Sequence, residues 1–172
     1  MLNFSTKFLG WVRNVTLPWK RFGHCAVSLG KQGVFVAGGV GSFEENGSKT
    51  AAIMNMSENK VLALDNSPSA KKFTKCALFE KKVYVGDEGK ANISVYNLET
   101  KKWESDIVLG HRTLLTLFTN RGHIYVLAFD INTQTYHVQD LQDDSFDETL
   151  QITDEKISST VILFKDLLNC IS

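Results

Sequence analysis

Short runs of apolar residues alternate with polar turns along most of the chain. Cys25 to Leu29 is a run of small apolar residues, Gly30-Lys31-Gln32-Gly33 is a turn, and Val34 to Ala37 is a β-branched and aromatic run that stops at Gly38-Gly39. Runs of this length bounded by glycine are typical of two strands joined in a hairpin. No segment has the 3.6-residue spacing of a helix. The pattern therefore predicts an all-β chain.

The predicted hairpin recurs along the chain in degenerate form. Its four copies cover residues 21–39, 72–86, 114–128 and 160–171. Phe73 and Cys76 of the second copy follow Phe22 and Cys25 of the first at a spacing of 51 residues. The unit of repetition is about 40 to 50 residues, and we expect the differences in length to fall in loops.

A second pair of predicted strands lies between successive hairpins. In the clearest instance, Tyr96 is followed after six residues by Trp103. Related spacings start at Phe4, Met54, Tyr96 and Tyr136. Each unit is then a four-stranded antiparallel meander, which can bury both of its faces only when copies stack around an axis. The repeat therefore predicts a β-propeller.

These motifs resemble the kelch repeat family, which carries Gly-Gly after an apolar strand, then Tyr-x6-Trp, then Leu-Pro and an Arg-x-x-His-like start of the next unit. The matching residues are Gly38-Gly39, Tyr96 with Trp103, Trp11 with Leu17-Pro18, and Arg21 with His24. The match is uneven, because Gly86-Asp87 stands where the second copy should have Gly-Gly and Ala128-Phe129 stands there in the third. A WD40 propeller fits less well, since no Trp-Asp follows Gly110-His111.

The resemblance implies a kelch-like propeller of about three full blades with a half-blade at each terminus. The expected boundaries are a half-blade at 1–20, blades at 21–66, 72–108 and 111–152, and a half-blade at 157–172. Closed propellers typically have 4 to 8 blades. Either the two halves pair to close a four-bladed ring, or the chain is part of a longer propeller. We favour the second, because the family usually has more blades.

Composition and charge narrow the class of partner. Acidic and basic residues number 19 each, so no overall field would attract nucleic acid or an anionic membrane. No apolar run approaches the ~20 residues of a membrane span, and no secretory signal is visible. The three cysteines, Cys25, Cys76 and Cys170, are odd in number and widely spaced, which favours reduced thiols and a cytoplasmic location.

No catalytic, cofactor or metal motif stands out. The four histidines, His24, His111, His123 and His137, lack the spacing of metal ligands. The segment Gly38-Gly39-Val40-Gly41 is not followed by a glycine at the third position of the G-x-G-x-x-G pattern, nor by the helix that a nucleotide-binding loop needs. A galactose-oxidase-like copper enzyme on the same fold is the alternative class, but its cluster of Tyr, His and a Tyr-Cys pair is not visible. We expect neither enzyme activity nor a cofactor; a non-functional truncated product is a further alternative.

A role in protein–protein interaction fits best, because loops on a rigid β scaffold carry function. The resemblance implies that partners bind the loops between blades and between second and third strands, as in the substrate-recognition part of a ubiquitin-ligase adaptor or in a cytoskeletal scaffold. No BTB, BACK or F-box segment is present, so an adaptor role would need a longer protein. The expected contacts are Trp19, Arg21, Phe43, Glu44, Glu45, Lys71 and Arg112; the residues expected to be structural are Trp11, Gly38, Gly39, Tyr96 and Trp103.

Overall fold

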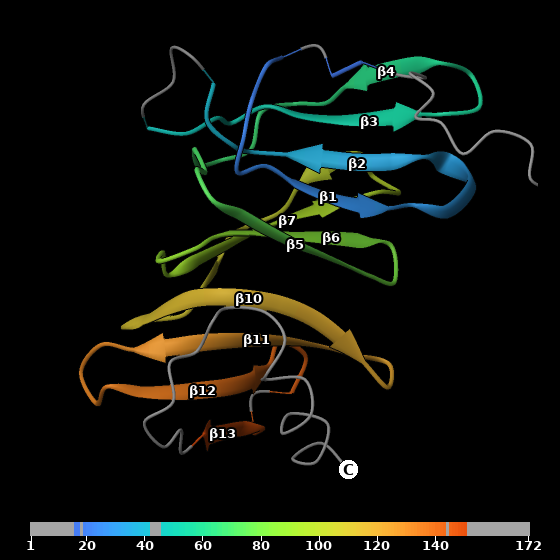
Figure 1. Ribbon diagram of the computed structural model, residues 1–172. Coiled ribbons are helices and arrows are strands. Elements are labelled where there is room, and N and C mark those ends of the chain that lie inside the picture. Colours follow the sequence, from blue (N-terminus) through green and yellow to red (C-terminus); the bar gives the residue numbers. More distant parts are fainter. Residues whose placement is uncertain (1–15, 18, 42–45, 144, 151–172) are drawn as a thin grey trace, which may run out of the picture.

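Three antiparallel sheets make up the protein in the computed structural model (Figure 1). The structure describes residues 16–17, 19–41, 46–143 and 145–150. Over these residues the only helical element is a short 3-10 turn at Gly30–Gln32, and no helix is long and apolar enough to cross a membrane. The predicted all-β class is confirmed.

The first sheet has the order β1-β2-β3-β4. Its strands are β1 (Cys25–Ser28), β2 (Val34–Ala37), β3 (Ala51–Asn55) and β4 (Lys60–Ala63). The predicted first hairpin is confirmed, and its turn closes where Gly33 donates its backbone N–H to the Gly30 carbonyl at 3.2 Å. Gly33 has φ +116°, and a Cβ there would lie 2.1 Å from the Met54 carbonyl oxygen, so this turn requires glycine.

The second sheet repeats this order with β5 (Thr74–Phe79), β6 (Lys82–Asp87), β7 (Asn92–Asn97) and β8 (Lys102–Trp103). A short strand β9 (Ile107–Val108) pairs with β7 beyond the end of β8. The third sheet contains β10 (Arg112–Asn120), β11 (His123–Asp130), β12 (Thr135–Asp140) and β13 (Asp147–Leu150). All three sheets are therefore meanders with the strand order that the repeat predicts.

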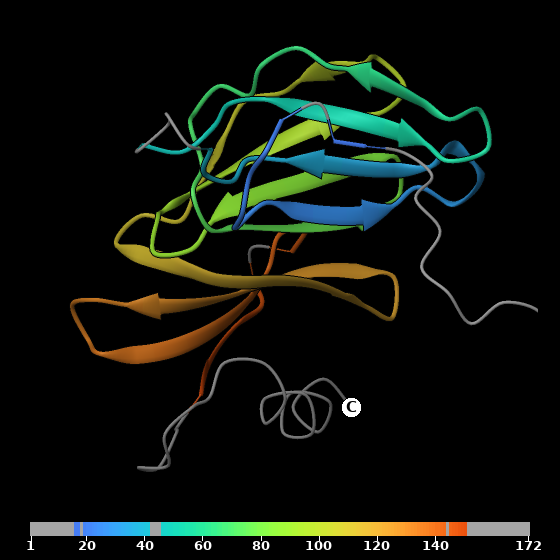
Figure 2. The same cartoon turned by 45° about the horizontal axis from the view of Figure 1, so that its top comes forward.

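Neighbouring sheets contact one another through their first strands, and their faces enclose two hydrophobic cores. Strand β1 contacts β5, and β5 contacts β10 (Figure 1). The first two sheets lie face to face in the upper part of Figure 2, with the third below them. One core, between the first and second sheets, includes Phe35, Ala37, Val83, Val85 and Tyr96. The other, between the second and third sheets, includes Tyr84, Ile93, Leu114, Ile124 and Val126.

Aromatic residues fill the first of these cores. Tyr96 is 1 % exposed, and its ring lies 5.1 Å from that of Trp103 in a T-shaped arrangement and 5.6 Å from that of Phe35. The Trp103 indole N–H donates to the backbone carbonyl of Asp65 at 2.8 Å. This hydrogen bond links β8 to the segment that follows β4. Tyr96 and Trp103 thus lie where two sheets pack together.

The expectation of reduced thiols is wrong for Cys25 and Cys76, which form a disulfide with a Cα–Cα distance of 5.8 Å. The two cysteines lie in β1 and β5, the first strands of neighbouring sheets, and these two strands contact one another. Of the predicted half-blade at 1–20, residues 1–15 and 18 lie outside the described residues, as does the whole predicted half-blade at 157–172; Trp11 and Cys170 fall in these parts.

Candidate functional site

Two phenylalanines lie exposed beside each other where the first two sheets begin. Phe22 is 61 % exposed and Phe73 is 52 % exposed, and their ring centroids lie 6.5 Å apart. The other large apolar side chains that are exposed in the described part of the chain are Met56, Leu62, Val108 and Ile131. No second pair of exposed aromatic rings occurs among the described residues. We call Phe22 and Phe73 the aromatic pair.

Backbone hydrogen bonds hold Phe22 in place. Its N–H donates to the Val40 carbonyl at 3.1 Å, and the Val40 N–H donates back to the Phe22 carbonyl at 2.8 Å. Gly39, which precedes Val40, has φ +90°, and a Cβ there would lie 2.7 Å from the Phe22 carbonyl oxygen. The second glycine of the predicted Gly-Gly motif is therefore needed for the close approach of these two segments.

A buried carboxylate holds Phe73. Asp87 is 4 % exposed, and its Oδ1 accepts the backbone N–H of Lys72 at 3.0 Å and of Phe73 at 2.9 Å. The Glu88 N–H donates to the Phe73 carbonyl at 2.9 Å. Asp87 occupies the position where the sequence lacks the second glycine of the motif. The departure from the kelch pattern thus coincides with a side chain that shapes the loop carrying Phe73.

The two halves of the aromatic pair are also joined across the sheets. The Thr74 N–H donates to the Gly23 carbonyl at 2.7 Å, and the Gly39 N–H donates to the Lys71 carbonyl at 3.0 Å. The Thr74 hydroxyl accepts from the Gly39 N–H at 3.2 Å as well. Both loops are consequently fixed relative to one another by backbone contacts adjacent to the exposed rings.

Trp19 and Arg21 lie together in the segment before Phe22. The Arg21 guanidinium carbon is 4.7 Å from the centre of the Trp19 ring, a cation–π contact. Arg21 Nη1 donates to the Gly38 carbonyl at 2.6 Å, and Nη2 donates to the Thr50 hydroxyl. Trp19 is partly exposed. Arg21 is expected as a partner contact, but its guanidinium group forms hydrogen bonds with the segments next to β2 and β3.

Lys71, another expected contact, is buried. The residue is 1 % exposed, and its Nζ donates to the Ser69 hydroxyl at 2.9 Å. Burial lowers the pKa of Lys71, while the charges of Asp106 and Asp87 act in the opposite direction. An ammonium group in this position contacts the interior of the loop and does not reach the surface that carries the aromatic pair.

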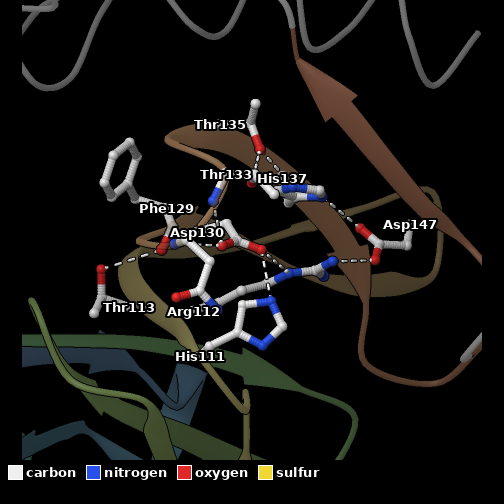
Figure 3. A network of polar contacts seen from close by, with 10 residues as sticks. His111, Arg112, Thr113, Phe129, Asp130, Thr133, Thr135, His137 and Asp147 are labelled. Carbon is white, nitrogen blue, oxygen red and sulfur yellow. Dashed lines mark hydrogen bonds and ion pairs between the residues drawn. The ribbon is translucent and has the colours of Figure 1, made fainter.

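Arg112, the third expected basic contact, belongs to a polar network in the third sheet (Figure 3). Its Nη2 lies 2.6 Å from Asp147 Oδ2, and its Nε lies 3.9 Å from Asp130 Oδ2. His111 Nε2 lies 2.7 Å from the same Asp130 oxygen. Burial works to raise the pKa of Asp147, but hydrogen bonds from Arg112 and His137 outweigh it and hold that pKa below its ordinary value.

The same network places a hydroxyl, an imidazole and a carboxylate in line. His137 Nε2 is 2.9 Å from the Thr135 hydroxyl, and His137 Nδ1 is 3.1 Å from Asp147 Oδ1 (Figure 3). The Thr135 hydroxyl also pairs with that of Thr133 at 2.6 Å, and the second Asp147 oxygen carries Arg112. These additional bonds extend the network to Thr133 and Arg112. The network therefore ties β10, β12 and β13 together.

The spacing of the histidines in the sequence indicates only whether they could bind a metal ion together. It does not indicate that carboxylates lie beside His111 and His137. Over the described residues, no group of three or more His, Cys, Asp or Glu side chains is placed to hold a metal ion. A shallow hollow of about 530 Å³ lies on the outer face of the first sheet, against Val36 and Met54. Phe43, Glu44 and Glu45, also expected as partner contacts, lie outside the described residues.

No protein-family model matches this chain, and no curated protein matches it.

Proposed function

We propose that this chain is a protein-interaction module and that the aromatic pair is the centre of its binding surface. The observation that supports the proposal is the exposure of Phe22 and Phe73 as neighbours, 6.5 Å apart, on two loops fixed by hydrogen bonds. Exposed aromatic rings lose unfavourable contact with water when a partner covers them, and aromatic residues are enriched among the residues that dominate binding energy. Fixed loops lose little conformational entropy on binding.

The charges around the aromatic pair indicate the kind of segment that it binds. Lys20 and Lys72 lie close to the two phenylalanines in the chain, and Lys75 forms a 3.1 Å ion pair with Glu88, next to Asp87. Asp87 itself is buried against the backbone. Positive charge therefore exceeds negative charge on the exposed part of these loops. A partner segment with an apolar side chain flanked by carboxylates has the complementary chemistry.

The architecture supports the wider proposal that the sheets are consecutive blades of a kelch-like propeller. Each sheet is a four-stranded meander, and their first strands contact one another in series, β1 with β5 and β5 with β10. In such an arrangement the starts of the first strands lie on one side, where the aromatic pair is found. A substrate adaptor or a scaffold, in a four-bladed ring or in a longer propeller, is the role we propose for that side. The cytoplasmic location stays a prediction.

Selection of peptides from a displayed random library tests the proposal, because it does not require the partner to be identified first. Peptides selected on the wild-type chain are retested on the double variant Phe22→Ser/Phe73→Ser. We expect the selected sequences to carry an apolar residue beside Asp or Glu, and their affinity for the double variant to fall at least about tenfold, the loss expected for one hot-spot residue.

Val108→Ser is the matched control, because Val108 is 72 % exposed and lies on β9, at the outer edge of the second sheet. We expect this variant to bind the selected peptides as the wild-type chain does. Circular dichroism and urea unfolding verify that all variants are folded. Equal binding to the double variant and the wild-type chain would show that the aromatic pair is not the binding surface.

A further inference from the structure

The disulfide joins the two segments a short distance along the chain from the aromatic pair. Cys25 follows Phe22 by three residues and Cys76 follows Phe73 by three residues, so the covalent link joins the two chain segments that carry the rings. We infer that the Cys25–Cys76 disulfide is a redox latch for the binding surface, and that its reduction loosens the two loops and separates the rings. This inference rests on the proposed function for its biological meaning.

Among the described residues, the other restraints on the two segments at this end are non-covalent: backbone hydrogen bonds and the bonds that the Asp87 carboxylate accepts from the Lys72 and Phe73 N–H groups. Backbone hydrogen bonds run between the segments from the Thr74 N–H to Gly23 and from the Gly39 N–H to Lys71. Each such hydrogen bond contributes modestly to stability, and a local segment opens more often when a neighbouring constraint is lost. Without the covalent link, only non-covalent contacts of this kind would restrain the spacing of the rings.

The rest of the junction stays closed after reduction. The core between the first and second sheets continues past the cysteines through Phe35, Tyr96 and Trp103, whose rings contact one another. Burial of these large side chains is independent of the disulfide. Reduction therefore opens one end of the junction and leaves the sheets stacked, which makes the change local and reversible.

The chemistry needs a dithiol reductant. Its thiolate attacks one sulfur of the Cys25–Cys76 bond and releases the other as a thiolate, which leaves a mixed disulfide. The second thiolate of the reductant then attacks the reductant sulfur of that mixed disulfide and releases the remaining cysteine. The protein gains two electrons and two protons as two thiols, and the reductant leaves as its own disulfide. Cys25 is 7 % exposed and Cys76 is partly exposed, so attack occurs at Cys76, with the Cys25 sulfur as the leaving group.

Amide hydrogen exchange followed by NMR tests the latch on the whole chain with no partner present. The disulfide is first verified by mass spectrometry of the oxidised protein, and exchange is then compared with and without dithiothreitol. We expect exchange at the Thr74 and Gly39 amides to accelerate at least about tenfold on reduction, while the Val126 amide, in the centre of the third sheet, is unchanged.

Matched cysteine variants separate the latch from other effects of the reductant. Cys25→Ser/Cys76→Ser should exchange rapidly at Thr74 and Gly39 with or without dithiothreitol, and Cys170→Ser should respond as the wild-type chain does. Unchanged exchange after full reduction, equal acceleration at Val126, or three free thiols in the oxidised protein would each overturn the inference. Because this readout involves no peptide, it can succeed or fail independently of the peptide selection.

Discussion

Arg112, at the start of β10, lies 2.6 Å from Asp147, at the start of β13, through Nη2 and Oδ2. The ion pair joins the first and last strands of the third sheet, which share no ladder. The other Asp147 oxygen pairs with His137 of β12 (Figure 3). The outermost strand of the third sheet is therefore held by side chains from two other strands in addition to its own backbone hydrogen bonds.

Arg112→Met should reduce stability in a pH-dependent way. Asp147 has a pKa held below its ordinary value by Arg112 and His137, against the effect of burial. A carboxyl group with a lowered folded-state pKa stabilises the fold above its unfolded-state pKa, about 3.9, and this contribution is lost as the pH falls through the lower folded-state value. Urea unfolding at pH 7 should show a loss of about 1–2 kcal/mol, the lower part of the range for a hydrogen bond to a charged group, because solvent screens the partly exposed pair.

Below about pH 4 the difference between Arg112→Met and the wild-type chain should shrink, because Asp147 becomes protonated in both. The control is Lys102→Met, which removes a cation from an exposed position on β8. It should leave the pH dependence unchanged. A constant difference between Arg112→Met and the wild-type chain from pH 7 down to pH 2 would contradict this account of Asp147.

Gly39→Ala should be much more damaging than Gly30→Ala. Both glycines have positive φ, +90° and +62°, so each substitution carries a conformational cost of about 1–2 kcal/mol. A Cβ at Gly39 would in addition lie 2.7 Å from the Phe22 carbonyl and 2.9 Å from the His24 nitrogen, whereas nothing lies within 4 Å at Gly30. Overpacking of this kind typically adds about 1–3 kcal/mol. Thermal unfolding of both variants measures the difference, and similar values would show that Gly39 makes no essential close approach.

Asp87→Ala should release the loop that carries Phe73. The substitution leaves the N–H groups of Lys72 and Phe73 without their acceptor. The expected loss of unfolding free energy is about 1–3 kcal/mol, the cost of unsatisfied polar groups. Asp87→Asn keeps an oxygen acceptor and should lose less. NMR exchange at the two amides checks the cause directly; slow exchange in Asp87→Ala would mean that other contacts hold the loop.

The sequence predicts the strands well because they depend on local chemistry. Hairpins are indicated by the β-branched runs Val34 to Ala37 and Val83 to Val85 and by the polar turns that precede them, whatever lies next to them. The stacking of aromatic rings at Tyr96 and Trp103 also follows from their repeated spacing. These features do not depend on how neighbouring sheets are oriented.

The surface and the disulfide depend on that orientation, and the sequence is misleading about both. Phe22 and Phe73 anchor the repeat alignment, but the alignment does not tell whether their rings are buried or exposed. The odd number and wide spacing of the cysteines favour reduced thiols, and they do not reveal that contact between β1 and β5 brings Cys25 and Cys76 together. Arginine and lysine in predicted loops suggested solvent contacts because the sequence does not show which backbone carbonyls and hydroxyls lie within their reach.

Lys71→Met should abolish a rise in stability at alkaline pH. Burial lowers the pKa of Lys71 in the folded protein, against the charges of Asp106 and Asp87, so the unfolded chain binds this proton more firmly. The free energy of unfolding therefore rises as the pH increases from the folded-state pKa toward the unfolded value near 10.4. Below the folded-state pKa the cost of the buried ammonium is fully present. Methionine fills a similar volume without that cost, so the variant should be as stable as the wild-type chain at pH 7, or more stable.

The rise is measured as the difference in urea unfolding free energy between variant and wild-type chain from pH 7 to pH 10.5, which cancels the titrations that both share. Lys72→Met is the matched control, since the neighbouring Lys72 is only half-buried and should keep the wild-type dependence. A parallel pH dependence for Lys71→Met and the wild-type chain would mean that the Lys71 ammonium is solvated in solution. In that case its side chain would reach the surface beside the aromatic pair, as a partner contact requires.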